Sequence, residues 1–450
     1  MPTLNDLNDQ NPRQIAARVL RQRETGDEFT ENLLENALAR ASLSPSDRGL
    51  CLEIVYGVVR QQATLDWLIA RKTDGRPQKP ALQNLLRLGL YQIFWLDRIP
   101  PHAAVHESVE LAKRSGFASQ SGFINAVLRG CLRETDAIRK EIEDLKIRQP
   151  ALGYSQPAWL VERWRRHFGE ANLVRLLEWN NRPPKTYARV NTLKTAPDGL
   201  DGIDAAAKAL LERWKDEKVE YDFFTRDWTG ENLVFELKSH PPLAALPSFR
   251  EGRFYIQDPS TLLAVNRLGA RPGETILDLC AAPGGKTAFI AQQIQNQGRL
   301  VATDISEERL KLVRENCRRL GITCAQNDLV STLDPSLSVG TFDRVLVDAP
   351  CSNTGVFGRR VDLRWRISTD EILRLQKTQR ELLELAAQLL KPGGILVYST
   401  CSLEPEENSQ QVQEFLANRS NFKIESAREL SPFADQVDGA YVARLANTSA

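Results

Sequence analysis

Short apolar runs alternate with helix-like segments in the C-terminal half of this chain, and this alternation constrains the fold more than any other feature of the sequence. Strands are predicted at residues 274–279, 299–303, 323–326, 344–347, 395–399 and 422–426. Amphipathic segments separate them, including 306–320 and 371–390, and Ser368 with Glu371 forms a capping box at the start of the latter. Strands that alternate with helices build a parallel, doubly wound sheet. We therefore predict an α/β Rossmann-like domain over residues 246–450.

The N-terminal part of the chain shows a different pattern. From residue 11 to about residue 140, apolar residues recur three and four positions apart, as in Leu50, Ile54 and Val58, and no alternating strand pattern competes with them. This spacing predicts an all-helical domain over residues 1–145.

Residues 146–245 combine both kinds of pattern. Residues 186–191 have the pattern of a strand and residues 202–217 that of a helix, and Ser155 can cap a further helix with Pro157 in its first turn. We predict a small α+β linker module here. The chain then has three domains, which its 450 residues allow.

Composition and cysteine spacing narrow the functional classes. With 42% hydrophobic and 26% charged residues, the chain is typical of a folded globular protein. Its start lacks a signal-peptide pattern and no apolar run reaches the ~18 residues of a membrane span, so we expect a cytoplasmic protein with no membrane partner. The seven cysteines form no CxxC pair, which argues against a disulfide framework or a zinc knuckle, and we expect no metal. Because the net charge is only +1, any nucleic-acid affinity must come from local patches.

A glycine-rich turn follows the first predicted strand of the α/β domain. Its residues are Cys280, Ala281, Ala282, Pro283, Gly284, Gly285 and Lys286. Ligands of open α/β sheets bind where the strands end, and the helix after such a turn offers them free backbone N–H groups. Asp304 ends the next strand, about 20 residues further on, where a carboxylate typically holds a ribose.

The same turn lacks the third glycine of a dinucleotide site, and no second nucleotide-binding half follows it. We therefore predict S-adenosylmethionine as the cofactor, with Asp328, after the third strand, placed to reach its adenine. Asp304 and Asp328 have an alternative role, since most aspartates at such positions only cap helices or end strands.

Two later strands each end in a cysteine. Cys351 follows Val345-Leu-Val-Asp-Ala-Pro, and Cys401 follows Leu396-Val-Tyr-Ser-Thr. The C5 atom of cytosine reacts poorly with a sulfonium methyl group, but a thiolate that adds at C6 makes an enamine whose C5 can attack. A base must then remove the C5 proton so that the thiolate can leave. Asp348 is placed to bond the N3 and amino edge of the base, and position alone does not say which thiol attacks.

The alternative for a cysteine is a buried, inert packing role. We assign that role to four of the seven cysteines, Cys51, Cys131, Cys317 and Cys324. For Cys351 and Cys401 it is the less favoured interpretation, because packing has no special need for a thiol in a turn after an apolar strand.

Several motifs together resemble the RsmB/NOP family of RNA cytosine C5-methyltransferases. They are residues 280–286, Asp348-Ala-Pro-Cys-Ser352 and Ser399-Thr-Cys-Ser402, with Arg189-Val-Asn191 and Gln257-Asp-Pro-Ser260 similar to upstream motifs of that family. Asp47-Arg-Gly-Leu50 and residues 101–109 resemble a NusB-type RNA-binding domain. One departure is at residues 440–441, where Ala-Tyr replaces the paired aromatics common in the family.

The resemblance implies a class I methyltransferase behind an N-terminal NusB-like domain. It implies that Cys401 is the nucleophile and that Cys351 assists product release. It also places the glycine loop, Asp304, Asp328 and Asp348 around S-adenosylmethionine, and a cytosine of 16S rRNA, free or within a pre-30S particle, as the substrate. We expect the enzyme to be monomeric.

A basic and aromatic stretch follows Cys351. Its residues are Arg359, Arg360, Arg364, Trp365 and Arg366. Cationic and aromatic side chains suit phosphates and an unstacked base, so we predict that these residues bind RNA.

Two other functions remain open at this point. A tRNA cytosine C5-methyltransferase would use the same mechanism on another RNA. A non-catalytic NusB-like RNA-binding or assembly factor would keep only the N-terminal domain, and the presence of both cysteines, Asp348 and the glycine loop argues against it.

Overall fold

The computed structural model describes residues 11–194, 202–329 and 340–449, and the chain forms two compact units. The first unit is Met1–Arg182 together with Phe357–Arg366, and the second is Pro183–Val356 with Ile367–Ala450. The chain thus leaves the second unit after Val356 and returns to it at Ile367.

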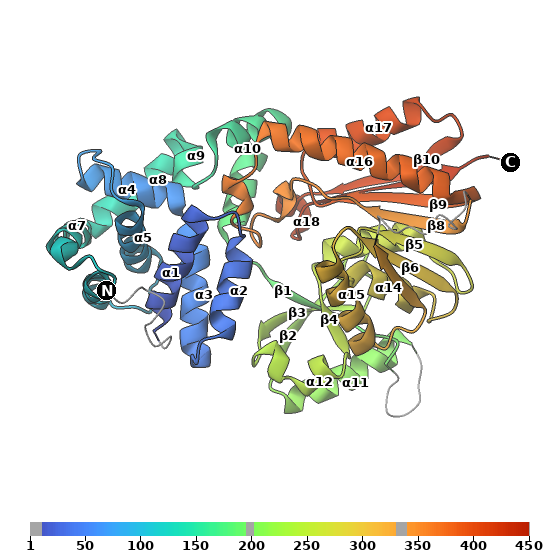
Figure 1. Ribbon diagram of the computed structural model, residues 1–450, viewed down its shortest axis with the longest axis horizontal. Helices are drawn as coiled ribbons and strands as arrows, with labels where there is room; N and C mark the ends of the chain where they lie inside the picture. Colours follow the sequence, from blue (N-terminus) through green and yellow to red (C-terminus); the bar gives the residue numbers. More distant parts are fainter. Residues whose placement is uncertain (1–10, 195–201, 330–339, 450) are drawn as a thin grey trace. The chain divides into compact units, whose positions relative to one another are not determined.

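The first unit is helical, which confirms the prediction for this part of the chain (Figure 1). Its α-helices are α1 (Pro12–Thr25), α2 (Thr30–Ala39), α3 (Pro45–Arg60), α4 (Gln62–Lys72), α5 (Pro80–Trp95), α6 (Pro101–Arg114), α7 (Ser121–Arg133), α8 (Thr135–Arg148), α9 (Pro150–Gly153) and α10 (Ala158–Asn181). Helix α5 is buried along most of its length, with Leu86 and Leu88 at 0% exposure. Helix α3 packs closely on it, because a Cβ at Gly57 would lie 1.9 Å from the ring of Tyr91.

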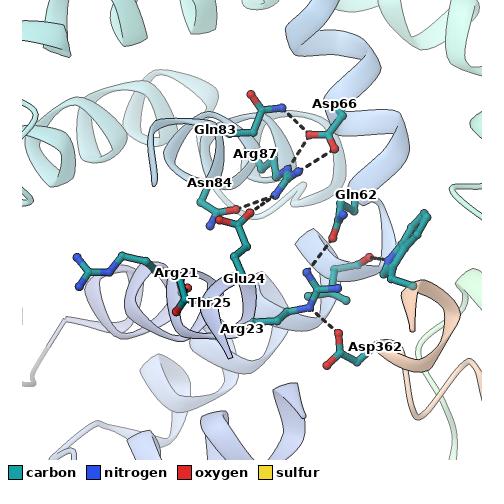
Figure 2. Close-up of polar contacts among 12 residues, drawn as sticks. Arg21, Arg23, Glu24, Thr25, Gln62, Asp66, Gln83, Asn84, Arg87 and Asp362 are labelled. Atoms are coloured by element: carbon teal, nitrogen blue, oxygen red, sulfur yellow. Dashed lines mark hydrogen bonds and ion pairs between the residues drawn. The ribbon is translucent and has the colours of Figure 1, made fainter. Parts of the chain in front are cut away.

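A buried charge network joins three helices of this unit (Figure 2). Arg87 of α5 donates to both carboxylate oxygens of Asp66 in α4, at 2.7 and 2.8 Å, and to Glu24 of α1 at 2.8 Å. A guanidinium that is 8% exposed needs such partners, because an unpaired buried charge is strongly destabilising. The network therefore ties α1, α4 and α5 to one another.

Residues 357–366, called the inserted segment below, belong to this helical unit although they follow Cys351 in the chain. Val361 is fully buried in the helical core. Asp362, also at 0% exposure, accepts a hydrogen bond from Arg23 Nε at 2.5 Å (Figure 2). It also accepts the backbone N–H of Thr30 at 3.0 Å. The sequence patterns did not predict this placement.

The prediction that Ser155 caps a helix is wrong. Helix α10 begins at Ala158 with Pro157 as its capping residue, and Ser155 lies outside it with a left-handed φ of 52°. The Ser155 hydroxyl instead accepts the backbone N–H of Ala63 at 2.9 Å. A tertiary contact with the start of α4 has replaced the local cap.

A four-stranded antiparallel sheet opens the second unit. Its order is β2-β3-β1-β4, with β1 (Thr186–Val190), β2 (Glu220–Phe224), β3 (Val234–Ser239) and β4 (Phe254–Ile256). Helix α11 (Ile203–Asp216) packs Trp214, which is 0% exposed, against this sheet, and α12 (Pro247–Arg250) follows β3. The sequence predicted β1 and α11 but not β2, β3 or β4.

The larger sheet of this unit has seven strands in the order β10-β11-β9-β8-β5-β6-β7. Its strands are β5 (Thr275–Leu279), β6 (Arg299–Asp304), β7 (Ala325–Leu329), β8 (Phe342–Asp348), β9 (Leu390–Thr400), β10 (Phe422–Leu430) and β11 (Ala440–Asn447). Strands β7, β6, β5, β8 and β9 run parallel, while β11 pairs antiparallel with both β9 and β10. All six predicted strands are present, and β11, which was not predicted, makes the sheet mixed.

Helices cover both faces of this sheet, as a doubly wound fold requires (Figure 1). They are α13 (Leu262–Leu268), α14 (Gly285–Gln293), α15 (Glu307–Leu320), α16 (Thr369–Leu389), α17 (Ser409–Ala417) and α18 (Pro432–Asp435). Neighbouring residues of β5 point to opposite faces: Ile276 packs with α13 and α14, and Leu277 packs with α16 and α17. Ser368 caps α16 by accepting the N–H of Glu371, in agreement with half of the predicted capping box.

Candidate active site

The glycine loop turns sharply at the carboxyl end of β5. Cys280 and Gly284 both have left-handed backbone angles, with φ of 70° and 102°. A Cβ at Gly284 would lie 3.3 Å from Cα of Val313, so a side chain would crowd α15 as well as strain the backbone. The turn brings residues 280–286 together at the edge of the sheet and starts α14 at Gly285.

Two upstream motifs brace this loop. Arg189 of β1 is 2% exposed and donates to the carbonyl of Gly285 at 3.0 Å and to Gln257 at 2.5 Å. Burial lowers the pKa of Arg189 to about 9. Asn191 donates to the carbonyls of Gly252 and Leu320. Arg189 therefore holds the loop directly, and Asn191 fixes the backbone at Gly252 and Leu320.

Asp304 lies at the end of β6, directly beside the glycine loop. It is 1% exposed, and its carboxylate accepts the backbone N–H groups of Ala282 and Ser306, each at 3.3 Å. Arg309 reaches the same carboxylate at 3.4 Å. Asp328 lies within β7, paired in register with Thr303, and its side chain is outside the described part of the chain.

Lys286 and Asp348 form an ion pair between the first turn of α14 and the end of β8. Lys286 Nζ lies 2.7 Å from Asp348 Oδ2. Burial lowers the pKa of Lys286, but the carboxylate of Asp348 and the nearby Cys401 outweigh it, so the pKa lies above its ordinary value. The structure thus places a retained positive charge close to Cys401.

Asp278, inside β5, is a site residue that the sequence analysis missed. Its side chain is 0% exposed, Thr287 donates to Oδ2 at 2.6 Å, and Oδ1 has no hydrogen-bond partner among the described residues. Burial raises the pKa of Asp278 to about 7, and the charges of Asp348 and Asp304 add to the effect. The signal in the sequence was a carboxylate within an otherwise apolar strand next to the glycine loop.

The two predicted cysteines meet at the carboxyl edge of the sheet. The sulfur atoms of Cys351 and Cys401 are 3.3 Å apart, and neither cysteine is in a disulfide. Cys351 is 7% exposed, whereas Cys401 is half-buried and faces Asn353 Oδ1 at 3.1 Å. The hydrogen bond to Cys401, together with burial, raises the pKa of Cys351 well above that of a free thiol. The two thiols are therefore adjacent but not equivalent.

A buried glutamate, also missed from the sequence, joins the loops that carry the two thiols. Glu407 is 0% exposed and accepts the backbone N–H of Ser352 at 2.9 Å, the hydroxyl of Ser402 at 2.5 Å and the amide of Gln379 at 3.0 Å. It also bonds the hydroxyl of Ser352. Burial raises the pKa of Glu407. Ser352 and Ser402 each follow a site cysteine, so one carboxylate fixes the spacing of both.

Two glycines also connect the loop that carries Cys401 to neighbouring backbone. The N–H of Gly355 donates to the carbonyl of Cys401 at 3.0 Å, and the N–H of Gly439 donates to the carbonyl of Gly355 at 2.9 Å. A Cβ at Gly355 would lie 2.8 Å from the Cys401 carbonyl. Beside this contact, Ala440 and Tyr441 are both buried in β11, so the two residues that depart from the family pattern are packed.

Burial raises the pKa of each of the other five cysteines, Cys51, Cys131, Cys280, Cys317 and Cys324. Cys51, Cys131 and Cys317 are buried in apolar clusters, and burial raises the pKa of each. Cys280 belongs to the glycine loop, where burial and then the charges of Asp348 and Asp304 raise the pKa of its thiol.

The residues predicted to bind RNA lie in the inserted segment, within the helical unit. Arg364 is 0% exposed and donates to the carbonyls of Asn180 and Phe357 at 2.9 and 3.0 Å. Trp365 donates its indole N–H to the Val59 carbonyl at 2.8 Å, and Arg366 donates to the carbonyls of Asp27 and Glu28. In this structure Arg364 and Trp365 therefore anchor the segment and do not present their polar groups to RNA. Arg360 is exposed, its guanidinium 5.5 Å from the ring of Phe29, and Arg359 is half-buried.

Neither a metal centre nor a membrane-spanning element is present in the described ranges. Nowhere in them do three or more His, Cys, Asp or Glu side chains gather in a way that could hold a metal ion. Of the helices that the structure describes, none has both the length and the apolar character needed to cross a bilayer.

Fold and site together define a class, a Rossmann-like methyltransferase joined to a NusB-like helical domain. A family model described as 16S rRNA methyltransferase RsmB/F matches residues 265–446, and a NusB family model matches residues 10–133. A third model, the ferredoxin-like domain of RsmF/B-like methyltransferases, matches residues 156–200. The chain belongs to the RsmB/F family of 16S rRNA methyltransferases.

Full-length relatives establish this membership. The probable ribosomal RNA small subunit methyltransferase B of Synechocystis sp. is 37% identical over 428 residues, which cover 93% of this chain and 92% of the relative. The corresponding Bacillus subtilis protein is 35% identical, with 93% of this chain and 90% of the relative covered. The ribosomal RNA small subunit methyltransferase B of Escherichia coli is 35% identical over 97% of this chain and 98% of its own length.

Solved structures agree with the fold. The crystal structure of PH0851 aligns with a TM-score of 0.76 at 25% identity and covers 96% of this chain and 98% of that chain. A methyltransferase homologue from Pyrococcus horikoshii aligns with a TM-score of 0.55 at 30% identity, covering 68% of this chain and 99% of that one. The family matches fall one in each of the three predicted domains, whose boundaries stay predictions.

Proposed function

We propose that this protein methylates C5 of a specific cytosine in 16S rRNA, with S-adenosylmethionine as the methyl donor, through a covalent bond between Cys401 Sγ and C6 of the base. The observation that carries the proposal is the pair of sulfur atoms 3.3 Å apart, beside the Lys286–Asp348 ion pair. A single thiol would suffice for addition to C6. A second one at this distance suits the removal of the C5 proton that must follow.

The surroundings of the two thiols support different roles for them. Cys401 is the more exposed, so a substrate base can reach it, and the positive charge of Lys286 lies nearby to offset the negative charge that the addition step spreads over the ring. Cys351 is buried and its raised pKa keeps it protonated in the free enzyme. We therefore assign Cys401 as the nucleophile and Cys351 as the residue that assists release.

The addition step forms the Sγ–C6 bond and moves the C5–C6 electron pair toward C5. Negative charge spreads over the ring, and the ammonium of Lys286 offsets it. Asp348 accepts a hydrogen bond from the amino edge of the base while it holds Lys286 in place. S-adenosylmethionine, when bound, supplies the electrophilic methyl group that C5 takes.

The release step restores the aromatic ring. Cys351 first gives its own proton to solvent, and as a thiolate it then removes the C5 proton. The C5–H electron pair re-forms the C5–C6 double bond, and the Sγ–C6 bond breaks to return Cys401 as a thiolate. The main influence that raises the pKa of Cys351 is its hydrogen bond to Cys401. In the adduct Cys401 is a neutral thioether, so this influence is lost and the Cys351 thiol ionises more readily to the thiolate that takes the C5 proton.

The residues around the glycine loop fit S-adenosylmethionine. Asp278 has a buried carboxylate oxygen with no hydrogen-bond partner among the residues that the structure describes, in electrostatic reach of Asp304 and Asp348. A ligand with a sulfonium and an ammonium group would offset these three acidic side chains. We assign Asp304 to the ribose hydroxyls, Asp328 to the adenine and the backbone of residues 280–286 to the amino-acid end of the ligand.

The 16S rRNA is the substrate that the relatives' names favour, since all three are named as small-subunit ribosomal RNA methyltransferases. A substrate of this kind places the protein in the cytoplasm. A tRNA cytosine would use the same chemistry. Bisulfite sequencing of total RNA from a deletion strain decides between them: loss of one 5-methylcytosine in 16S rRNA is expected, and its loss from tRNA alone would contradict the proposed substrate.

Trapping the adduct tests the mechanism. Cys351→Ala is expected to accumulate a protein–RNA complex that survives a denaturing gel, because the adduct forms but resolves slowly. Cys401→Ala is expected to form no complex and no 5-methylcytosine. Cys324→Ala, at a half-buried thiol outside the site, is the control and should behave as the native protein. A complex with Cys401→Ala and none with Cys351→Ala would reverse the assigned roles.

A further inference from the structure

The helical unit contains a pocket of about 670 Å³ that no part of the proposed reaction uses. Its walls come from the end of α5, from α8, from the turn after α9 and from the end of α10, all within the first unit. This volume lies within the roughly 300–1,000 Å³ typical of pockets that enclose one small ligand.

The charge of the lining favours an anion. Arg139, Lys140, Lys146 and Arg182 face the pocket against two carboxylates, Glu143 and Glu178. Both carboxylates form ion pairs with cations of the lining: Lys146 pairs with Glu143 at 2.6 Å, and Arg182 pairs with Glu178 at 3.4 Å.

Two cationic side chains of the lining have no carboxylate partner among the described residues. Arg139 and Lys140 are both exposed, and neither forms an ion pair with any residue that the structure describes. A cation without a protein partner at the rim of a pocket is available to a phosphate group. The pocket thus has a place for the backbone of a nucleic acid.

Aromatic rings of the same pocket suit a base. Trp95 is half-buried, and one face of its ring is stacked on Tyr91 with centroids 5.8 Å apart. Tyr154 also lines the pocket, with Lys146 Nζ 5.7 Å from its ring centroid. Aromatic side chains next to cations are how proteins hold unstacked bases of single-stranded RNA.

We propose that this pocket binds an unpaired nucleotide of the substrate RNA, with its phosphates on Arg139 and Lys140 and its base against Trp95. The nucleotide is distinct from the target cytosine, because neither site cysteine lines the pocket. The inference rests on the proposed RNA substrate and adds a second contact that selects it.

The test compares two double variants of the full-length protein. Arg139→Ala with Lys140→Ala removes the two free cations of the pocket. Lys113→Ala with Arg114→Ala removes an adjacent, exposed pair from the last turn of α6, outside the pocket, and is the matched control. Binding of a 16S rRNA fragment is measured by filter retention between about 0.05 and 0.5 M salt.

The pocket variant should lower the slope of log Kd against log salt by about 1.4, since each single-strand phosphate contact contributes about 0.7. At 0.1 M salt this corresponds to a Kd roughly 10- to 30-fold higher, and the control should stay within about threefold of the native value. Equal losses in the two variants would show that only general charge was removed and would overturn the proposal.

Photocrosslinking identifies the contact independently. RNA that carries 5-iodouridine should crosslink to the peptide containing Trp95 or Tyr154, and a map without either peptide would count against the pocket. Both measurements detect binding, not methylation. If the protein binds RNA through the pocket but forms no 5-methylcytosine, the proposed reaction is wrong and the proposed pocket is supported. If the protein forms 5-methylcytosine but the pocket variant binds RNA as tightly as the native protein, the proposed reaction is supported and the proposed pocket is wrong.

Discussion

At the scale of single residues, the two site cysteines differ in ways that their sequence positions do not reveal. Each follows an apolar strand, and the sequence motifs make both of them candidates. Their exposure, the Asn353 contact of Cys401 and the buried hydrogen bond of Cys351 depend on how two loops meet. No local pattern specifies how two loops meet, so the residues alone made both thiols candidates, and only the family resemblance predicted their separate roles.

Lys286 is predicted to matter for the thiol and not only for the glycine loop. Lys286→Gln removes the positive charge near Cys401 and should slow formation of the covalent adduct by about 100-fold, the usual effect of deleting one preorganised electrostatic group. Single-turnover rates in the Cys351→Ala background measure this effect. Lys286→Arg keeps the charge and is the control; equal rates in the two variants would rule out an electrostatic role.

Asp278 is predicted to make stability depend on pH. Its carboxyl holds a proton up to about pH 7 in the fold but releases it near pH 4 when unfolded, so the contribution present below pH 4 is lost as the pH rises through about 7. The free energy of unfolding should fall by up to about 1.4 kcal/mol per pH unit across this range from this group. Asp278→Asn cannot titrate and should lack that part of the slope. Urea unfolding at pH 5, 6 and 7 measures it, and parallel curves for the two proteins would contradict the assignment.

At the scale of helices and strands, the pattern of apolar residues predicted most strands of the large sheet. All six predicted strands of the large sheet are present. Five of them, β5 to β9, are its parallel strands, of which β5, β6, β8 and β9 are rich in buried apolar residues, while β10 is a mostly exposed antiparallel edge strand. Strand β11 was missed although it lies inside the sheet, and β2, which reads Glu-Tyr-Asp-Phe-Phe, is mostly exposed and lacks a clean alternation. Such strands form because a neighbour offers an edge to pair with, and that information is not local.

Glu407 acts at this scale, since it connects the loops after β8 and β9. Glu407→Gln loses acceptor capacity for Ser352 and Ser402, so the two sulfur atoms should no longer be held at their spacing. Displacement of a reacting group by about 1 Å can cost on the order of 100-fold in rate. We expect a 10- to 100-fold lower kcat with affinity for S-adenosylmethionine within about twofold, measured by methyl transfer and calorimetry. Glu414→Gln, exposed on α17, is the control, and equal kcat in both variants would leave Glu407 without a positioning role.

At the scale of the whole molecule, the inserted segment makes the helical unit discontinuous in sequence. The basic and aromatic residues that suggested an RNA contact include the anchors of this segment, with Arg364 and Trp365 bonded to backbone carbonyls. Composition could not distinguish anchoring of the segment from RNA binding, because arginine and tryptophan serve in both. Only the tertiary structure separates them.

Asp362 is predicted to stabilise the helical unit from outside its contiguous sequence. Asp362→Ala leaves Arg23 and the backbone N–H of Thr30 without their buried partner, which should cost about 3–5 kcal/mol. Hydrogen exchange should therefore become at least about 100-fold faster in α1 and α2, while β5 and β8 of the other unit exchange as before. Asp97→Ala, exposed in the turn after α5, is the control. Unchanged hydrogen exchange in α1 and α2 would show that Asp362 of the inserted segment does not stabilise the helical unit.

The inserted segment also sets an order of events during synthesis. Residues up to Arg182 leave the ribosome first, but Val361 and Asp362, which complete their core, follow about 175 residues later. At roughly 5–20 residues per second, the helices wait on the order of 10–35 s for these residues. During that interval the part of the helical unit that the inserted segment later covers is exposed to solvent and to chaperones. The helical unit, although made first, can reach its final form only after most of the catalytic unit has been translated.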